Sequence, residues 1–460
     1  MKLFYALFLF LSITLNAEVR DSINVDSLYL NFNVLAYNFD FDNAEQVASK
    51  LINDFPQSPY GYHAEALLNM WYFMGSRDDG DAKVFLEFSD LALQRFEKYY
   101  EQTETPLSAY RIGEEYMFRT IVFLFLHKQV KSFWNLKKAV SYFKLSNKLD
   151  NTFVDGYLGI GLFEYSLVYA PSALKVGLFL VGLSADAKKG ISDLKVAVNS
   201  GRYSRDEAEF QLSKIYSDYY FNINKSNKYL IPLLKKYPGN IFFKYQYSIN
   251  LIKDKQLTLA EQQLDRIVKY SNKHFMQLKA FSYFLKGEVK FTQNDFPGAI
   301  ENYKNFFQFA RSAEFLGYAN YKDKRASIIS LHYLENNLQN VNLALIYARN
   351  LIESGKYSEA LDALDTTIVK SDIEKKEKFL LSAEAFIELK DYRNAKLNLT
   401  KAEYILIDDN YWNTYLLYLY SKYFLETNKP VEFNNYYEKA KESDCGSFEL
   451  KAKIMGLGEQ

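Results

Sequence analysis

The chain has 460 residues, of which 48% are hydrophobic and 17% aromatic, so it has ample material for a large core and is not a disordered polymer. Lysine plus arginine and aspartate plus glutamate number 56 each, which excludes the basic surface of a nucleic-acid-binding protein, and there is neither an acidic tail nor a contiguous polybasic block for anionic lipid. Only 19 glycines and 8 prolines occur, which favours long helices joined by short turns.

The first residues have the pattern of a cleaved secretory signal peptide. Lys2 precedes an apolar stretch from Leu3 to Leu15, and Leu15-Asn16-Ala17 offers a small residue at the cleavage position. The stretch is shorter than the roughly 20 residues that span a bilayer. We therefore expect residues 1–17 to be removed and the mature chain to be exported, periplasmic or secreted, with no transmembrane span. A retained anchor or a buried first helix is the alternative.

Helical hairpins are predicted along the N-terminal half. The segment Phe41-Asp42-Asn43-Ala44 places an aromatic residue three positions before a small one, and its unit closes at Asp54-Phe55-Pro56. Ala139, followed by Phe143, opens a similar helix. The stretch 75–135 departs from this pattern, so the spacing of the N-terminal half is irregular.

A second irregular stretch covers residues 156–203. Gly159-Ile-Gly161 lies in a helical pattern without a phosphate-binding loop, which favours close helix packing over nucleotide binding. The apolar segment from Leu162 to Leu183 is interrupted by Glu164 and Lys175. Because a charge near a bilayer centre costs at least a few kcal/mol, we interpret this segment as a buried helical hairpin and not as a membrane span.

A repeated pattern is clearest in the C-terminal half. The segment from Gly355 to Ala360 has a counterpart from Lys390 to Ala395, and the segment from Asn294 to Ala299 has the same form. Each contains a turn, an aromatic residue and, three positions later, a small residue that opens a second helix. A further small residue lies twelve positions earlier, where it lets the paired helices approach closely. These residues are Gly287, Ala348 and Ala383.

This unit resembles the tetratricopeptide repeat (TPR), whose period is about 34 residues. The resemblance implies an all-α, right-handed superhelical solenoid of antiparallel helix pairs, each burying its apolar face on the next. We expect irregular TPR-like repeats over residues 18–240 and regular TPR repeats, continuous with them, over residues 241–460. Less regular units are anchored at Ala260 with Ser248, at Ser226 and at Ala440.

A local likeness accompanies the repeat. The segments 185–194 and 202–208 are similar to a family of TPR-like proteins known for inclusion-body clearance in fungi, which has a comparable glycine- and proline-containing helix before a small-residue hairpin. The likeness contains no chemical motif, and it carries no function to this chain.

Catalytic and metal-binding signatures are missing from the sequence. His63, His127, His274 and His332 stand apart without metal-ligand spacing, and the lone Cys445 has no nucleophile context. The segment 78–81 lacks the closing glutamate of an EF-hand, so a solvated turn is expected there. The neighbours Glu114 and Glu115 are expected to point in different directions on one helix. We therefore predict no enzyme, no metal and no cofactor.

The TPR resemblance also implies a groove, because the first helices of successive pairs line the concave face of such arrays. The residues predicted to face it form an apolar, aromatic strip with alternating charges, suited to an amphipathic helix or an extended peptide. They depart from the Lys/Asn pattern that clamps a terminal carboxylate. We call this set the groove positions: Phe281, Phe284, Glu288, Asn342, Leu345, Arg349, Leu380, Glu384, Tyr415, Tyr418 and Lys422.

Together these features predict an exported TPR-like scaffold or adaptor that mediates protein–protein interaction in the cell envelope. Its partner would be a protein or peptide and not a nucleic acid. One alternative is a structural envelope component that assembles with copies of itself, which concentration-dependent oligomers would indicate. The other is a ligand-binding or enzymatic protein with a site in residues 75–203, which a bound metal or small molecule would indicate.

Overall fold

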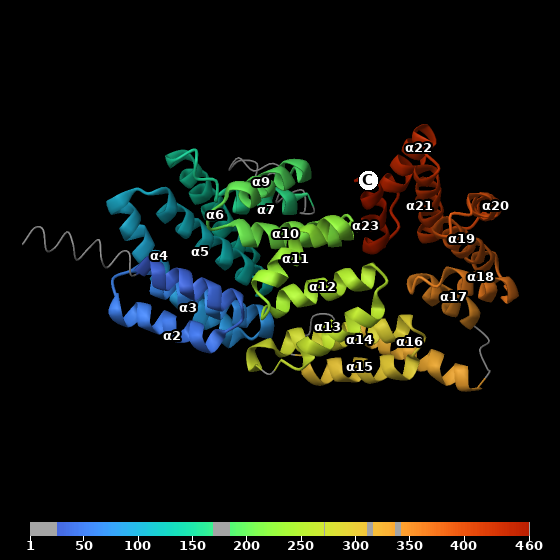
Figure 1. The fold of residues 1–460 in the computed structure, drawn as a ribbon, viewed down its shortest axis with the longest axis horizontal. Helices are drawn as coiled ribbons and strands as arrows, with labels where there is room; N and C mark the ends of the chain where they lie inside the picture. The colour runs from blue at the N-terminus through green and yellow to red at the C-terminus, as the bar shows by residue number, and fades with distance from the viewer. Residues whose placement is uncertain (1–24, 169–184, 271, 311–315, 336–341, 460) are drawn as a thin grey trace, which may run out of the picture. The chain divides into compact units, whose positions relative to one another are not determined.

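A computed structural model describes residues 25–168, 185–270, 272–310, 316–335 and 342–459. Every regular element in these residues is a helix (Figure 1), so the predicted all-α class is confirmed. The chain forms two compact units: one comprises residues up to Leu212 with Pro232–Ile241 and Asn272–Phe275, and the other comprises Ser213–Ile231, Phe242–Ser271 and the chain from Met276. The predicted boundary between residues 240 and 241 falls where the two units alternate along the chain.

The first unit is built from long antiparallel helices. Neighbouring helices pack as α2 with α3, α3 with α4, α5 with α6, and α7 with α9. The helices are α2 (Phe41–Asp54), α3 (Pro59–Ser76), α4 (Asp79–Thr103), α5 (Pro106–Phe125), α6 (Gln129–Leu149), α7 (Tyr157–Leu167) and α9 (Ala187–Ser200), with the 3-10 turn η1 (Lys273–Phe275). Two further helices, α10 (Arg205–Asp218) and α11 (Ile223–Lys236), contribute residues to both units.

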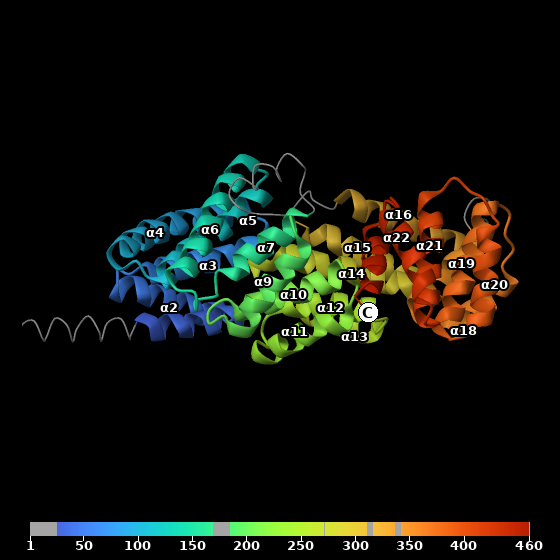
Figure 2. The ribbon, with the colours of Figure 1, turned by 90° about the horizontal axis from the view of Figure 1, so that it is seen from above.

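The second unit contains the regular repeats. Its hairpins pair α14 with α15, α17 with α18, α19 with α20, and α21 with α22. Figure 2 shows α19 and α20 side by side, as Figure 1 does. The helices are α12 (Ile241–Lys253), α13 (Leu257–Val268), α14 (Met276–Thr292), α15 (Phe296–Phe309), α16 (Leu316–Glu335), α17 (Leu343–Glu353), α18 (Tyr357–Thr366), α19 (Asp372–Glu388), α20 (Tyr392–Glu403), α21 (Asn410–Glu426), α22 (Pro430–Glu442) and α23 (Phe448–Leu457). The antiparallel, TPR-like helix pairs implied by the sequence are confirmed.

Small residues at the helix crossings explain why these pairs form. Ala348 and Ala383 on the first helices, and Ala360 and Ala395 on the second, are fully buried. A Cβ built on Gly287 would lie 2.4 Å from Cε1 of Tyr303, so the tyrosine ring occupies the space that a larger residue would need. Protein interiors are close-packed, and a ring in van der Waals contact with a glycine fixes the separation of α14 and α15.

The hairpins of the second unit also share one turn geometry. The second residue after the end of each first helix has positive φ, which closes the helix with a left-handed residue. Where the next residue is aspartate, its side chain caps the second helix: Asp295 accepts from the Gly298 amide at 3.0 Å, and Asp391 from the Asn394 amide at 3.1 Å. The left-handed residues are Lys255, Asn294, Gly355, Lys390 and Asn428.

Candidate functional site

The groove positions lie on or at the start of α14, α17, α19 and α21, the first helices of four pairs in the second unit. Their exposure divides them into two groups. Phe281, Glu288, Asn342, Arg349 and Lys422 are partly exposed. The buried ones are Phe284, Leu345, Leu380, Glu384, Tyr415 and Tyr418.

Three of the buried groove positions belong to the repeat core. The Phe284 ring lies 5.6 Å from that of Tyr303, within the α14–α15 pair. Leu345 packs in an apolar cluster shared by α17, α18 and α19, and Leu380 packs in one shared by α19, α20 and α21. In this structure these side chains stabilise the helix pairs. Partner binding at them stays a prediction.

The aromatic groove positions on α21 are covered by the C-terminal helix of the same chain. Leu450, Ile454 and Leu457 of α23 belong to the same buried cluster as Tyr415 and Tyr418. These three apolar residues recur at spacings of four and three, which places them on one face of the helix. The helix α23 therefore packs on the last hairpin, against both α21 and α22, with one apolar face in the cluster that contains Tyr415 and Tyr418.

A charged contact joins the same helix to α17. The Lys453 ammonium lies 3.6 Å from the Glu353 carboxylate and 2.9 Å from that of Glu449. Burial alone would lower the pKa of Lys453, but Glu353 and Glu449 outweigh it, so this pKa lies well above its ordinary value. Burial would likewise raise the pKa of Glu353, but Lys453 and Lys255 outweigh it and lower that pKa. Both partners are therefore charged, and the contact between α23 and α17 is an ion pair.

Other ion pairs connect successive repeats along this surface. Arg349 on α17 pairs with Glu377 on α19, and Lys422 on α21 pairs with Glu388 on α19. The Tyr415 hydroxyl donates to Glu384, a further link between α21 and α19. Such pairs fix the register of one hairpin on the next. In each of these ion pairs, one positive side chain is matched by one carboxylate.

The turn between α12 and α13 contributes a lysine to this region. The Lys255 ammonium donates to the Ile352 carbonyl at 2.7 Å and to the Tyr357 hydroxyl at 3.0 Å. Burial would lower the pKa of Lys255, but Glu384 and Glu353 outweigh it and raise that pKa. The sequence alone does not indicate Lys255 or Lys453, because their contacts join segments that are distant in the sequence.

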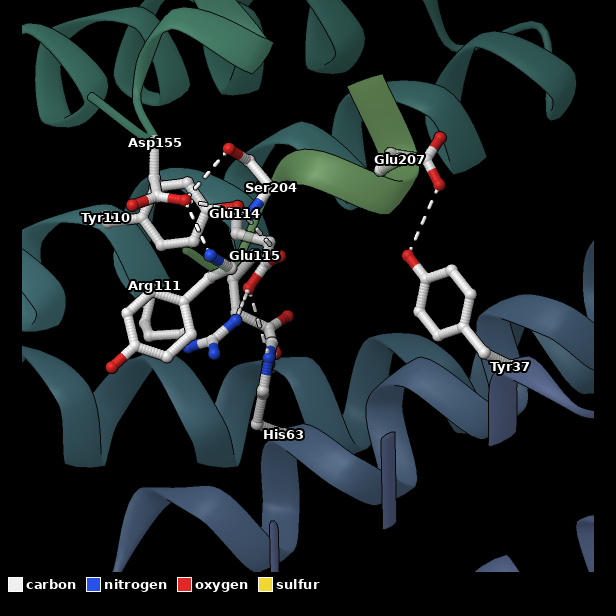
Figure 3. A network of polar contacts seen from close by, with 10 residues as sticks. Tyr37, His63, Tyr110, Arg111, Glu114, Glu115, Asp155, Ser204 and Glu207 are labelled. Carbon is white, nitrogen blue, oxygen red and sulfur yellow. Dashed lines mark hydrogen bonds and ion pairs between the residues drawn. The ribbon is translucent and has the colours of Figure 1, made fainter. Parts of the chain in front are cut away.

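A buried polar network lies in the first unit, within the stretch that the sequence left without a repeat pattern (Figure 3). His63 on α3 has its Nδ1 2.5 Å from Oε1 of Glu115 and its Nε2 3.3 Å from Oε2 of Glu114. The two glutamates point in different directions along α5, as expected for neighbours on a helix. The His63 ring lies between them and contacts both.

Arginine completes this network. The Arg111 guanidinium lies 2.5 Å from Oε2 of Glu114, and the Ser89 hydroxyl donates to Oε2 of Glu115 at 2.8 Å. Burial would raise the pKa of Glu114, but Arg111 and His63 outweigh it and lower that pKa to about 2. His63 responds in the opposite sense: burial would lower its pKa, yet Glu114 and Glu115 raise it.

The network holds three helices together. His63 is 1% exposed and Glu115 is fully buried, so neither side chain faces solvent. Its contacts join α3 to α5 through His63, and α4 to α5 through Ser89. Nearby, one carboxylate oxygen of Asp155 accepts from the Tyr203 amide at 2.7 Å and from the Ser204 amide at 2.8 Å. These two hydrogen bonds join the α6–α7 connection to the start of α10.

A solvent-open hollow of about 400 Å³ lies beside this network, on the surface formed by α4, α5 and α6. Arg119 spans it, with an ion pair to Asp90 at 2.6 Å and a hydrogen bond to Asn135 at 3.2 Å. Its lining combines aromatic, cationic and anionic side chains. They are Asp90, Leu93, Gln94, Glu97, Tyr116, Arg119, Trp134, Asn135 and Lys138.

The acidic segment 78–81 has structural partners. Asp78 caps α4 by accepting from the Gly80 amide at 2.8 Å, and Asp81 accepts from the Ser76 hydroxyl at 2.5 Å and lies 3.0 Å from Nδ1 of His274. Across the described ranges, three or more histidine, cysteine or acidic side chains do not gather as a metal site would require. The Cys445 thiol is buried and donates to the Ser447 carbonyl at 3.4 Å.

The glycines of 159–161 support helix packing. A Cβ on Gly161 would lie 2.7 Å from the Gly190 carbonyl oxygen, so only glycine lets α7 approach α9 this closely. The helix α7 ends at Leu167, and most of the apolar segment from Leu162 to Leu183 lies outside the described residues, as does the expected signal peptide. Among the helices that could be searched, none is both long and apolar enough to cross a bilayer.

Comparisons with known proteins add little to this geometry. No family model matches the chain, and no curated protein matches it in sequence. Among solved structures, it resembles the TPR domain of P58(IPK) (13% identity, TM-score 0.21, 82% of this chain and 98% of the other), yeast Tom70 (11%, 0.24, 83% and 94%) and the Cut9–Hcn1 hetero-tetramer of the APC/C (11%, 0.23, 94% and 95%). TM-scores this low do not support a conclusion about this chain. The TPR-like class is supported instead by the helix pairs, their small crossing residues and their shared turns.

Proposed function

We propose that the chain is a protein-binding TPR-like scaffold whose first-helix surface in the second unit accepts an amphipathic helix from a partner protein. The observation that carries this proposal is α23, which already occupies the surface in cis. It packs Leu450, Ile454 and Leu457 on the cluster that contains Tyr415 and Tyr418. A surface that holds one helix through an apolar face has the area to hold another with the same apolar spacing.

The contacts of α23 define the chemistry of that partner. It presents apolar side chains at relative positions i, i+4 and i+7, which Leu450, Ile454 and Leu457 occupy in cis. It carries a lysine or arginine at i+3, where Lys453 meets Glu353. Because α23 has only 10 residues, it gains little from helix propensity and depends on docking. A longer partner helix with the same pattern would compete with it.

We also propose that the scaffold acts in the cell envelope after export. The support for this is the pattern of Lys2, the apolar stretch Leu3 to Leu15 and the small residue Ala17. The test is N-terminal sequencing of the protein isolated from fractionated cells of its host. A mature chain that begins at Glu18 in an envelope or secreted fraction is the expected result. A chain that begins at Met1 in the cytoplasmic fraction would contradict export.

Photo-crosslinking in the host tests the binding surface. Probes replace Arg349 and Lys422, which are partly exposed groove positions, and matched control probes replace Leu397 and Val431, which are exposed on the second helices α20 and α22. Each probe is placed in the native chain and in a Leu450→Asp chain, in which a buried carboxylate would disfavour docking of α23.

The expected result is one partner protein captured only from Arg349 and Lys422, and more strongly in the Leu450→Asp chain. Its crosslinked segment should be an amphipathic helix with the pattern described above. Capture of a second copy of this chain would favour the structural assembly. Equal adducts from groove and control probes would contradict the proposal.

A further inference from the structure

The α5–α6 turn and the helix α6 carry only positively charged side chains among their ionised residues. From Tyr116 to Leu149 the chain contains Arg119 and six lysines and no aspartate or glutamate, although the whole chain is electrically balanced. The lysines are spread along the sequence, which is why no polybasic block was expected. The helix α6 itself carries five of them and no acidic residue. The lysines are Lys128, Lys131, Lys137, Lys138, Lys144 and Lys148.

Few of these lysines are neutralised by the protein. Lys131 lies over the Phe123 ring at 5.6 Å and Lys137 over the Trp134 ring at 5.4 Å, and neither forms an ion pair among the described residues. On the hollow side, Asp90 is already paired with Arg119 at 2.6 Å, and Glu97 accepts from the Tyr116 hydroxyl at 3.0 Å. The charges of Lys131 and Lys137 are therefore the ones that a surface ligand can neutralise.

Apolar side chains project from the same end of the hairpin. Trp134 is 56% exposed and Val130 is 73% exposed, and they lie one helical turn apart on α6. Leu124, in the last turn of α5, is also exposed. Exposed aliphatic and indole groups beside uncompensated lysines are the combination with which proteins enter the interface of a bilayer.

We infer that the α5–α6 tip, defined as Leu124, Val130 and Trp134 with Lys131 and Lys137, binds the surface of an anionic lipid bilayer. The three apolar groups enter the headgroup layer, and the two lysines lie over the lipid phosphates. A bilayer fits this tip better than an acidic protein does, because Leu124, Val130 and Trp134 are all more than half exposed, although Trp134 also lines the rim of the hollow between α4, α5 and α6. This inference is independent of the helix-binding surface in the second unit.

Tryptophan fluorescence reports this contact directly. The chain has 3 tryptophans, and Trp71 and Trp412 are buried, so Trp134 is the one whose surroundings a surface ligand would change. The probes are vesicles of phosphatidylcholine with about a third phosphatidylglycerol, vesicles of phosphatidylcholine alone, and a polyglutamate peptide. We expect a blue shift and co-sedimentation with the anionic vesicles, at least tenfold stronger than with the neutral ones.

Variants separate the lysines from the indole. Lys131→Glu/Lys137→Glu should weaken anionic-vesicle binding at least tenfold. The control Lys83→Glu/Lys98→Glu makes the same charge change at exposed positions of the neighbouring helix α4 and should leave binding within twofold. Trp134→Phe should abolish the blue shift while most of the sedimentation remains. Far-UV circular dichroism checks that each variant is folded. The inference would be overturned if the two charge-reversal variants had equal effects. It would also be overturned if Trp134 fluorescence responded to polyglutamate and not to vesicles.

Discussion

Lys453 and Glu353, one hundred residues apart in the sequence, form an ion pair 3.6 Å long that joins the C-terminal helix α23 to α17. Beside this pair, Ile454 is buried in the cluster that contains Tyr415 and Tyr418. The first-helix surface of the second unit is therefore occupied by the chain's own helix. Because both the charged and the apolar contacts come from one short helix, they can be tested independently of the repeat core.

The Lys453–Glu353 pair should contribute modestly to stability at neutral pH. Glu353 is partly exposed, so Glu353→Gln should lower the free energy of unfolding of the second unit by about 1 kcal/mol. The pKa of Glu353 is lowered in the folded chain, so its contribution is present above its ordinary pKa and is lost as pH falls through the folded value.

A double-mutant cycle with Lys453→Met, measured by urea unfolding, checks this prediction. The coupling energy should be present at pH 7 and should decrease in acid. A coupling energy of zero at pH 7 would show that the pair does not hold α23.

Glu114, which lies between His63 and Arg111, should contribute more to the free energy of unfolding than Glu353 does. Glu114→Gln removes the carboxylate that compensates Arg111 in a buried site, and such losses cost about 3 kcal/mol. The control Glu101→Gln changes an exposed glutamate on α4 and should cost less than about 0.5 kcal/mol. Urea unfolding, followed by the fluorescence of Trp71 in the first unit, measures both. Similar losses from the two variants would contradict the role of the network.

His63 should make the first unit sensitive to alkaline pH. Its pKa is raised in the folded chain, so its contribution is fully present below its ordinary pKa of 6.5 and is lost as pH rises through the folded value. The native chain should therefore lose stability over that window, and His63→Gln should flatten the dependence. Unfolding free energies measured from pH 6 to pH 9 check this. A slope that is unchanged in His63→Gln would assign the pH dependence to other groups.

The crossing glycine of α14 should tolerate no side chain. Gly287→Ala places a Cβ 2.4 Å from the Tyr303 ring, and overpacking of this kind costs about 1–3 kcal/mol. Gly317→Ala in α16 is the matched control, since a Cβ there meets no atom within 4 Å. Thermal unfolding should show a lower midpoint for Gly287→Ala alone. Equal midpoints would mean that α14 and α15 can separate without cost.

The sequence predicted the elements that local physics determines. Period, small crossing residues and turn residues revealed the helix pairs, because each of these signals operates within about 34 residues. Gly287, Ala348 and Ala383 were found in this way, and all are buried at crossings. The groove positions followed from the resemblance, which gives the helix face but not what covers it.

Contacts between distant segments could not be predicted in this way. The apolar spacing of Leu450, Ile454 and Leu457 was visible in the sequence, but nothing local indicated that Tyr415 and Tyr418 would be their neighbours. Likewise, His63 lies 52 positions from Glu115, and the pairing depends on how α3 meets α5. Such contacts are fixed by packing and not by propensity.

Binding of α23 in trans tests the central claim most directly. A fluorescein-labelled peptide with the sequence of residues 444–459 is titrated with the native chain and with a Leu450→Asp/Ile454→Asp chain whose folding is checked by circular dichroism. Fluorescence anisotropy should show binding to the variant at least tenfold tighter than to the native chain, where α23 already occupies the surface. A peptide with Ile454→Asp should not bind. If the variant chain binds the native peptide no better than the native chain does, the second unit is not a surface that accepts helices.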